Sequence, residues 1–318
     1  MNKRVLITGG AGFVGSNLAH RLVKEGADVI VVDNLFTGDL ENLKDILGSI
    51  AFVEEDITEG FDVNDYQPEI IYHLAARNIS SSMKDPILDY STNIGGTLLL
   101  LEAVRERHVE RFIYTSSASV YGNPRYLPIN EDDGINLLTP YATSKYAGEG
   151  YCTAYYESYN IPTVVLRLSN VYGPRQSVSN PFCGVVAKFM NWAKNGENII
   201  MHGDGLSTRD YTYIDDVVDA LILAGISPKA EGEVFNVATG IETSTLELAN
   251  SVAILHILDH MDDDFDIDVV CADRRDIDNI RRRALNIEKI RRKLGWMPRY
   301  TLESGLALTK KWEEEKGG

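Results

Sequence analysis

Tyr141 and Lys145 stand four positions apart in the stretch TPYATSKYAGEG, which begins at Thr139. Residues four apart lie on one face of a helix, and Pro140 suits the first turn of such a helix. A phenol, whose ordinary pKa is about 10, becomes a competent general base at neutral pH when a nearby cation favours the phenolate. The pair therefore predicts proton abstraction by Tyr141; the alternative is a packing aromatic beside a solvated lysine.

A glycine-rich stretch, VLITGGAGFVGSN at residues 5–17, places Gly9, Gly12 and Gly15 between an apolar run and a helical pattern. Glycine permits a tight turn and a close backbone approach to a pyrophosphate, while a helix N-terminus supplies oriented N–H groups. The next apolar run ends at Asp33, whose carboxylate can accept hydrogen bonds from an adenosine ribose. No arginine directly follows Asp33, and a carboxylate repels a 2′-phosphate, so the pattern favours NAD over NADP.

The first half of the chain supplies a framework for these groups, because short apolar runs alternate there with helical patterns. Continuous apolar strands joined by helical crossovers imply a parallel sheet covered by helices on both faces. We predict an α/β fold, a Rossmann doubly wound parallel sheet with a smaller mixed α/β C-terminal substrate lobe. The expected strands are 4–8, 28–33, 51–56, 69–76, 111–117 and 163–169. Helices are expected at about 12–25, after the run 69–76 to about residue 108, and from 140 onward.

The pattern becomes less regular after about residue 170. A helix is expected to end near Lys194, an amphipathic helix to cover 212–225, and a strand at 233–239 to return to the parallel sheet. Ser244 and Glu247 form a capping box that opens a further helix. We assign the chain to an NAD-binding Rossmann domain, 1–169 with 212–239 returning to it, and a substrate lobe, 170–211 and 240–318.

The chain of 318 residues carries a formal net charge of -16, so it repels a phosphate backbone and nucleic acid is not an expected partner. Its three cysteines form neither a CxxC pair nor a metal-ligand cluster, which fits a reducing compartment. Too few apolar residues precede Gly9 for a signal sequence or membrane span, so we expect a cytoplasmic protein with no membrane partner. The aspartate-rich run 259–268 lacks the glycine and terminal glutamate of a calcium loop; we favour a solvated loop over a cation site and assign no metal.

The spacing GxxGxxG together with YxxxK resembles that of the extended short-chain dehydrogenase/reductases. The chain is similar to their NAD-dependent sugar epimerase/dehydratase family, and within it to UDP-glucose 4-epimerase-like enzymes, from VLITGG to LGW at 294–296. TSSASVYG at 115–122 is a further shared motif. The resemblance implies that the C-terminal lobe binds a nucleotide-sugar and that NAD contacts Gly9, Gly12, Phe13, Val14, Gly15, Asp33, Asn34, Thr37, Gly38, Asp56, Ile57, Leu74, Ala75, Ala76, Asn93, Thr115, Tyr141 and Lys145.

The same resemblance implies three catalytic residues, Tyr141, Lys145 and Ser117. Tyr141 would take the proton from a sugar hydroxyl while the carbon beneath passes hydride to NAD. Lys145 would lower the pKa of the phenol and hold the nicotinamide ribose, and Ser117 would hydrogen-bond the same hydroxyl. A serine at the end of a strand is otherwise an ordinary turn residue.

Ala118 and Ser119 follow Ser117 at a point where the dehydratases of the family carry an acidic residue. Neither side chain can supply a carboxylate, so we predict oxidation at C4, rotation of the keto-sugar and return of the hydride to its other face. The expected protein is therefore a UDP-hexose 4-epimerase that uses NAD and acts through a transient 4-keto intermediate. The alternatives are a UDP-uronate 4-epimerase, a nucleotide-sugar dehydratase, and a non-catalytic NAD-binding sensor, although such sensors typically lose the Tyr/Lys pair.

A UDP-sugar carries a diphosphate, which an acidic protein must hold with placed arginines. The resemblance implies that Arg209 binds this diphosphate and that Asn170 forms a hydrogen bond in the same region. Asn180 and Phe182 are expected either to line the nucleobase pocket or only to pack within their loop. The predicted substrate-binding residues are Ser117, Tyr141, Asn170, Asn180, Arg209 and Arg275.

Arg275 is our choice for the second diphosphate arginine, with Arg281, Arg282 and Arg283 as competitors, and a basic lead-in to a helix as the alternative. Counting back from LGW puts Arg283 where the family has the residue that gates the C2 substituent of the sugar. An arginine there would crowd an N-acetyl group or attract an acid. Arg175, in YGPRQ, is a second candidate partner for a sugar carboxylate.

The family also implies an oligomer. Its members commonly dimerise by packing the helix that contains Asn93 and the helix that contains YxxxK into a four-helix bundle. The stretch SKYAGEGYCTAYY offers small and aromatic residues for close helix packing. We therefore expect a homodimer.

Overall fold

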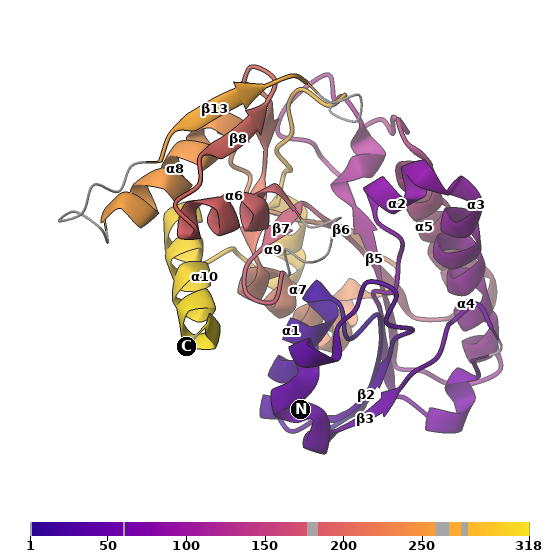
Figure 1. Cartoon of the computed structure of the whole chain (residues 1–318). Helices are drawn as coiled ribbons and strands as arrows, with labels where there is room; N and C mark the ends of the chain where they lie inside the picture. Colours follow the sequence, from indigo (N-terminus) through magenta and orange to yellow (C-terminus); the bar gives the residue numbers. More distant parts are fainter. Residues whose placement is uncertain (1, 60, 177–183, 259–266, 275–278, 318) are drawn as a thin grey trace.

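A parallel sheet of seven strands forms the centre of the computed structural model, which describes residues 2–59, 61–176, 184–258, 267–274 and 279–317 (Figure 1). The spatial order of the strands is β11-β6-β5-β4-β1-β2-β3, and every neighbouring pair is parallel. This is the predicted doubly wound Rossmann sheet. The strands are β1 Arg4–Thr8, β2 Asp28–Val32, β3 Ile50–Val53, β4 Ile70–His73, β5 Arg111–Ser117, β6 Thr163–Leu168 and β11 Val234–Val237.

Alternate residues of each strand enter two different cores, which is why the strands are apolar throughout. Val5 and Ile7 of β1 face one core, together with α1 (Phe13–Lys24) and α7 (Ile214–Ile226). Leu6 faces the other core, together with α4 (Thr97–Arg105) and α5 (Pro140–Tyr159). The carboxyl ends of the strands, where ligands bind in this architecture, all point to the same edge of the sheet.

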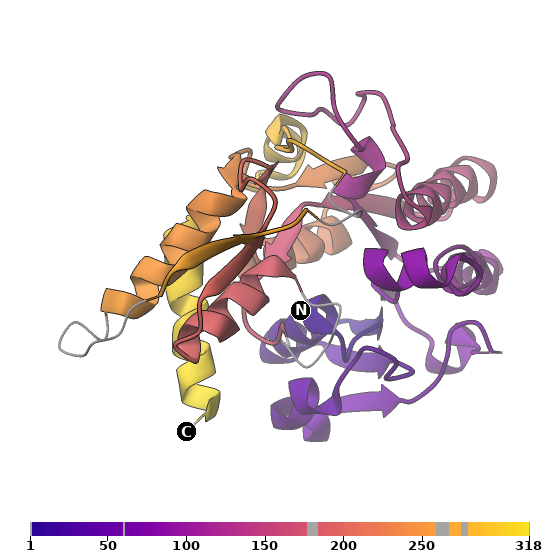
Figure 2. The ribbon, with the colours of Figure 1, turned by 45° about the horizontal axis from the view of Figure 1, so that its top comes forward.

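The remaining elements gather beside the sheet in a smaller lobe, which Figures 1 and 2 show from two directions. Parallel pairs join β7 to β10 and β8 to β13, and an antiparallel pair joins β9 to β12. The bounds are β7 Asn170–Tyr172, α6 Val185–Lys194, β8 Ile199–His202, β9 Thr208–Arg209, β10 Tyr211–Tyr213, β12 Thr243–Ser244, α8 Thr245–Ile257, β13 Val269–Ala272, α9 Glu288–Leu294 and α10 Leu302–Gly317.

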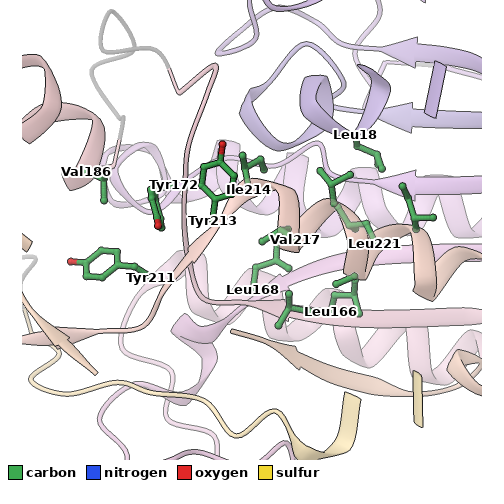
Figure 3. Close-up of a cluster of buried hydrophobic side chains, with 14 of the residues drawn as sticks. Leu18, Leu166, Leu168, Tyr172, Val186, Tyr211, Tyr213, Ile214, Val217 and Leu221 are labelled. Carbon is green, nitrogen blue, oxygen red and sulfur yellow. The ribbon is translucent and has the colours of Figure 1, made fainter. Parts of the chain in front are cut away.

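One continuous apolar core joins this lobe to the sheet. Figure 3 shows Tyr172 and Tyr213, whose rings meet edge to face with centroids 5.7 Å apart, beside Ile214 and Val217 at the start of α7. Leu166 of β6 and Leu18 of α1 belong to the same cluster. The two parts of the molecule are therefore packed together, and our division of the chain at residue 169 stays a prediction.

Most expected elements appear within a few residues of their predicted bounds, including the capping box at Ser244 and Glu247. The strands predicted at 51–56 and 69–76 are shorter, ending at Val53 and His73, because the following residues leave the sheet as ligand-binding loops. The helix predicted to end near residue 108 is divided into α2 Ile79–Lys84, α3 Pro86–Asp89, a π-helix η3 Tyr90–Gly96 and α4. Further short helices, which the sequence patterns did not indicate, are η1 Leu40–Ser49, η2 Val63–Tyr66, η4 Ala118–Tyr121 and η5 Pro228–Ala230.

Within the described residues, no helix is both long and apolar enough to cross a membrane. No group of three or more His, Cys, Asp or Glu side chains in this part of the chain is placed to hold a metal ion. The aspartates at 259–266 lie outside the described residues.

Candidate active site

The loop from β1 to α1 provides the turn that the glycine spacing predicts. Gly9 has φ +69°, and a Cβ atom added to it would lie 2.6 Å from the backbone nitrogen of Ala75. A Cβ on Gly15 would lie 2.3 Å from the carbonyl oxygen of Gly9. Only glycine fits these two approaches, which leave the first amides of α1 directed at the ligand space.

Asp33 closes this loop from the end of β2. Its carboxylate accepts hydrogen bonds from the backbone amides of Ala11 and Leu35, both at 2.9 Å. Burial raises the pKa of Asp33, and these amides oppose that effect. Gly38 packs directly on the carboxylate, since a Cβ there would lie 2.6 Å from Asp33 Oδ1. Asp33 thus fixes the loop that surrounds the expected adenosine ribose.

A cavity of about 580 Å³ lies over this loop. Its shape and donors fit a dinucleotide, because it combines the glycine turn, a helix N-terminus and the carboxylate of Asp33. Asn93 and Thr115 are buried and do not line it. The predicted cofactor residues that do line it are Gly9, Gly12, Phe13, Val14, Gly15, Asp33, Asn34, Thr37, Gly38, Asp56, Ile57, Leu74, Ala75 and Ala76.

Arg77 and Phe36 also line this cavity, and our sequence analysis missed both. The Arg77 guanidinium carbon lies 3.4 Å from the centroid of the Phe36 ring. Arg77 Nη1 is buried and has no hydrogen-bond partner among the described residues. The two residues come from separate loops, after β4 and after β2, so only the arginine in LAARN could have drawn attention to them.

Asn93 acts behind the cavity wall. Its side-chain oxygen accepts the backbone N–H of Arg77 at 2.7 Å, and its amide nitrogen donates to Asp89 at 2.6 Å and to Ser144 at 3.1 Å. Asn93 lies in the π-helix η3, and Ser144 lies in α5. These bonds fix the loop after β4 against the helix that carries Tyr141 and Lys145.

Tyr141 occupies the first turn of α5, and it lines a second, larger cavity together with Ser117 from the end of β5. Thr139 caps the helix by accepting the amide of Ala142 at 3.1 Å, so the phenol leaves the helix at a fixed point. Burial raises the pKa of the Tyr141 phenol, and a hydrogen bond with Ser117 opposes this effect. The charge of Arg283 also lowers the pKa of the phenol, and the charge of Asp89 raises it.

Lys145 follows Tyr141 by one helical turn of α5. It is buried, and its Nζ lies 4.8 Å from the centroid of the Tyr114 ring. Burial lowers the pKa of Lys145 to about 8, while the carboxylate of Asp89 acts in the opposite direction. Lys145 therefore remains mostly protonated at neutral pH, although its burial makes that charge costly.

The larger cavity, of about 1320 Å³, adjoins the dinucleotide cavity, and Asn78 and Gly184 line both. It brings together four predicted substrate residues, Ser117, Tyr141, Asn170 and Arg209. Asn180 and Arg275, like Phe182, fall outside the described residues. Lys145 does not line it.

The larger cavity is strongly cationic although the chain as a whole is acidic. Lys188, Arg209, Arg274 and Arg281 to Arg283 line it. The one carboxylate among its described lining residues is Asp204, which forms an ion pair with Arg281. At the end of β5, Ala118 is buried and Ser119 lines the cavity, so this position carries no acid. Such a cavity suits an anionic ligand.

Arg175 lies elsewhere than we expected. It lines the dinucleotide cavity, where its Nη1 donates to Asn17 Oδ1 of α1 at 3.0 Å. The larger cavity does not include it. The expectation that Arg175 meets a sugar carboxylate is therefore not supported, because the turn after β7, with φ +69° at Arg175, leads its side chain toward α1.

Comparison with known proteins decides the family. Residues 5–238 match the model of the NAD dependent epimerase/dehydratase family. The chain belongs to this family. Its members supply the cofactor assignment that the dinucleotide cavity fits, so NAD is the cofactor. The family model ends just after β11, the last strand of the central sheet.

Family relatives with different activities resemble the chain over almost its whole length. A UDP-glucose 4-epimerase of Mycolicibacterium smegmatis is 39% identical, covering 96% of this chain and 97% of the relative. A UDP-N-acetyl-alpha-D-glucosaminuronate decarboxylase of Bacillus cytotoxicus is 31% identical, covering 99% of both. The crystal structure of UDP-glucose 4-epimerase from Thermotoga maritima, with UDP-glucose, has a TM-score of 0.90 at 36% identity and covers 100% of both chains. The comparisons therefore establish a nucleotide-sugar epimerase/dehydratase and leave the exact reaction open.

Proposed function

We propose that this protein is a UDP-hexose 4-epimerase that uses NAD and proceeds through a transient 4-keto intermediate. The observation that carries the proposal is the position of Tyr141 and Ser117 in the cationic cavity, next to the dinucleotide cavity, at a strand end without a carboxylate. The 39% identical epimerase and the Thermotoga structure support it. The dehydratase alternative is weaker because elimination needs an acid that Ala118 and Ser119 cannot supply.

Each catalytic residue has a role that follows from its surroundings. NAD held in the dinucleotide cavity would supply the hydride acceptor for the sugar carbon and the donor for the hydride's return. Tyr141, as phenolate, takes the proton of the C4 hydroxyl, and Ser117 orients that hydroxyl. Lys145 favours the phenolate through its charge, and Tyr114 and Asp89 hold it in place. When the reaction reverses, Tyr141 returns the proton.

Epimerisation further requires that the keto-sugar turn over while its nucleotide stays bound. We assign this anchoring to Arg209 and Asn170, with Arg275 and Asn180 as further proposed ligands. Arg209 is held by a hydrogen bond from its Nη1 to the carbonyl of Thr208 at 2.7 Å. The cavity volume of about 1320 Å³ leaves room for the sugar to rotate.

Proton NMR of the purified protein, without added NAD, tests the reaction. The protein is incubated separately with UDP-glucose, UDP-N-acetylglucosamine and UDP-glucuronate. Appearance of the C4 epimer in at least one tube supports the proposal, with Tyr141→Phe as the inactive control. A keto or deoxy product would instead indicate a dehydratase. Silence in every tube, with NAD bound, would favour a different nucleotide-sugar first and a non-catalytic NAD-binding sensor second.

We also propose a homodimer built from η3–α4 and α5. Exposed large apolar residues on these helices support it: Tyr90, Leu99, Tyr146 and Tyr159 are 61%, 51%, 39% and 47% exposed. Figure 1 shows α3, α4 and α5 stacked along the outer side of the sheet, away from the smaller lobe. Light scattering after size exclusion measures the mass, and Tyr146→Glu is expected to yield monomers.

A further inference from the structure

Three consecutive arginines, Arg281, Arg282 and Arg283, enter the larger cavity and differ in their partners. Arg281 Nη1 binds both carboxylate oxygens of Asp204, each at 2.9 Å. Arg282 binds Glu242 with two nitrogens, at 2.9 and 2.5 Å. The first two arginines are thus neutralised by the chain itself, and both remain more than half exposed.

Arg283 has the opposite properties. Only 5% of its surface is exposed, and its Nε and Nη2 atoms are buried without a hydrogen-bond partner in the described part of the protein. Burial and the neighbouring charge of Arg209 lower the pKa of Arg283 to about 9, and Tyr141 acts in the opposite direction. Within the described part of the chain, no carboxylate is among the groups that shift this pKa. A buried guanidinium without an anion is costly, so a ligand that supplies one is strongly favoured.

The backbone holds Arg283 firmly in this position. Asp210, which is fully buried, accepts the amide of Leu285 at 3.2 Å and the amide of Gly240 at 2.9 Å. The amide of Ile129 donates to the carbonyl of Ala284 at 2.9 Å. The side chain is therefore presented to the cavity by a segment that is bonded on both sides, and its unsatisfied nitrogens are a built feature of the site.

We propose that Arg283 forms a subsite for a carboxylate carried by the sugar of the nucleotide-sugar substrate. The proposal rests on the proposed function, which places the sugar at Tyr141. The planar guanidinium offers a fork of donors that matches a carboxylate in two parallel hydrogen bonds. A neutral hydroxymethyl group can accept one such bond but leaves the charge of Arg283 unbalanced.

The diphosphate is the competing anion, since Arg209 lies close enough to affect Arg283. The position of Arg283 in the cavity favours the sugar. Tyr141 and Arg283 line the same cavity, and the charge of Arg283 lowers the pKa of the Tyr141 phenol, so the guanidinium lies within electrostatic range of the phenol to which the proposed function assigns the C4 hydroxyl. In a hexose the C4 hydroxyl is on the far side of the ring from the C1 diphosphate. Other cations, including Lys188 and Arg274, line the cavity as well.

Isothermal titration of the NAD-containing protein separates the two anions. The titrants are UDP, UDP-glucose and two acid-bearing sugars, UDP-glucuronate and UDP-N-acetylmuramate, which carry the carboxylate at different positions. The wild type is expected to bind at least one acid-bearing sugar about 10-fold or more tightly than UDP-glucose. Arg283→Met is expected to weaken that ligand by about 10- to 100-fold, as for the loss of a charge-assisted hydrogen bond, and to change UDP and UDP-glucose by less than about threefold.

Two further variants serve as controls. Arg283→Lys keeps a charge without the planar fork, so it should retain only part of the preference. Arg292→Met makes the same exchange at an exposed arginine of α9 and should bind all four titrants as the wild type does. Thermal melts of each variant report whether it has folded.

Two results overturn the proposal. If Arg283→Met weakens UDP, UDP-glucose and the acid-bearing sugars equally, Arg283 binds the diphosphate. If the wild type binds neither acid-bearing sugar more tightly than UDP-glucose, the subsite does not exist. The titration reports complex formation and not product, so a preference for an acid that persists when NMR detects no C4 epimer would refute the reaction and leave the subsite intact.

Discussion

Glu149 of α5 and Arg167 of β6 form a buried, two-point ion pair behind the active site. Arg167 Nε lies 3.0 Å from Glu149 Oε1, and Nη2 lies 2.6 Å from Oε2. Ser116, the neighbour of Ser117, donates its hydroxyl to the same glutamate. The pair thus ties the helix of Tyr141 to the strand of Ser117.

Glu149→Gln is expected to destabilise the protein by about 3 to 5 kcal/mol, because it leaves the Arg167 charge buried without its partner. Arg167→Met combined with Glu149→Leu should cost less than the sum of the two single changes, since the charges are removed together. Urea unfolding of the wild type, Arg167→Met, Glu149→Leu and the double variant measures the coupling energy between the two side chains. Strict additivity would mean that the pair contributes no mutual stabilisation.

Tyr141→Phe is expected to lower kcat by about 100- to 10,000-fold while NAD remains bound, because the general base is lost and the cofactor cavity is unchanged. Product NMR and the NAD absorbance of the denatured protein measure the two effects. Tyr126→Phe, at a residue that is 82% exposed, removes the same hydroxyl outside both cavities and should retain wild-type activity. Equal activity in both variants would exclude Tyr141 as the base.

Lys145 is expected to make stability rise between about pH 8 and 10.5 in the protein freed of NAD. Burial lowers the pKa of Lys145 from 10.5 to about 8, so in this window the unfolded chain binds a proton that the folded chain has released. Below pH 8 the buried charge lowers the free energy of unfolding by roughly 3 kcal/mol. Lys145→Met removes this charge and is expected to restore that amount. Chemical unfolding of wild type and variant at pH 7 and 10 measures the difference. A difference that does not change with pH would contradict the assignment.

Asp33→Asn is expected to weaken NAD binding by about 10- to 100-fold, because the ribose loses a charged acceptor. The preference for NAD over NADP should narrow at the same time, since the repulsion of a 2′-phosphate is removed. Fluorescence titration with both dinucleotides measures the two affinities. Asp65→Asn, at an exposed aspartate of η2, is the matched control. An unchanged ratio of the affinities would exclude Asp33 as the discriminating group.

The fold and the cofactor loop were predictable because their signals are local. The glycine turn, the strands that flank it and the cap of α8 each depend on residues close together in the sequence. The position of Arg175 was not predictable, since its contact with Asn17 joins residues far apart in the chain. The stacking of Arg77 on Phe36 likewise requires two separate loops to meet.

Arg283 shows the same limit within the candidate site. The distance in sequence between Arg283 and LGW predicted that Arg283 lies near the sugar. Three adjacent arginines, however, look alike in a sequence. Only the folded chain distinguishes them, because Asp204 and Glu242 approach the first two and no carboxylate of the described residues pairs with the third. Burial and pairing are properties of the tertiary structure.

The place of β11 at the edge of the sheet has a consequence for biosynthesis. Among the described strands its neighbour is β6, which ends at Leu168, and residues 169–233 must be synthesised before Val234 of β11 can pair with it. At about 5 to 20 residues per second, this takes roughly 3 to 13 seconds. During that interval β6 is an unpaired edge that can associate with strands of neighbouring nascent chains. The ribosome thus completes residues 170–211, the first segment of the predicted substrate lobe, before the cofactor sheet can close.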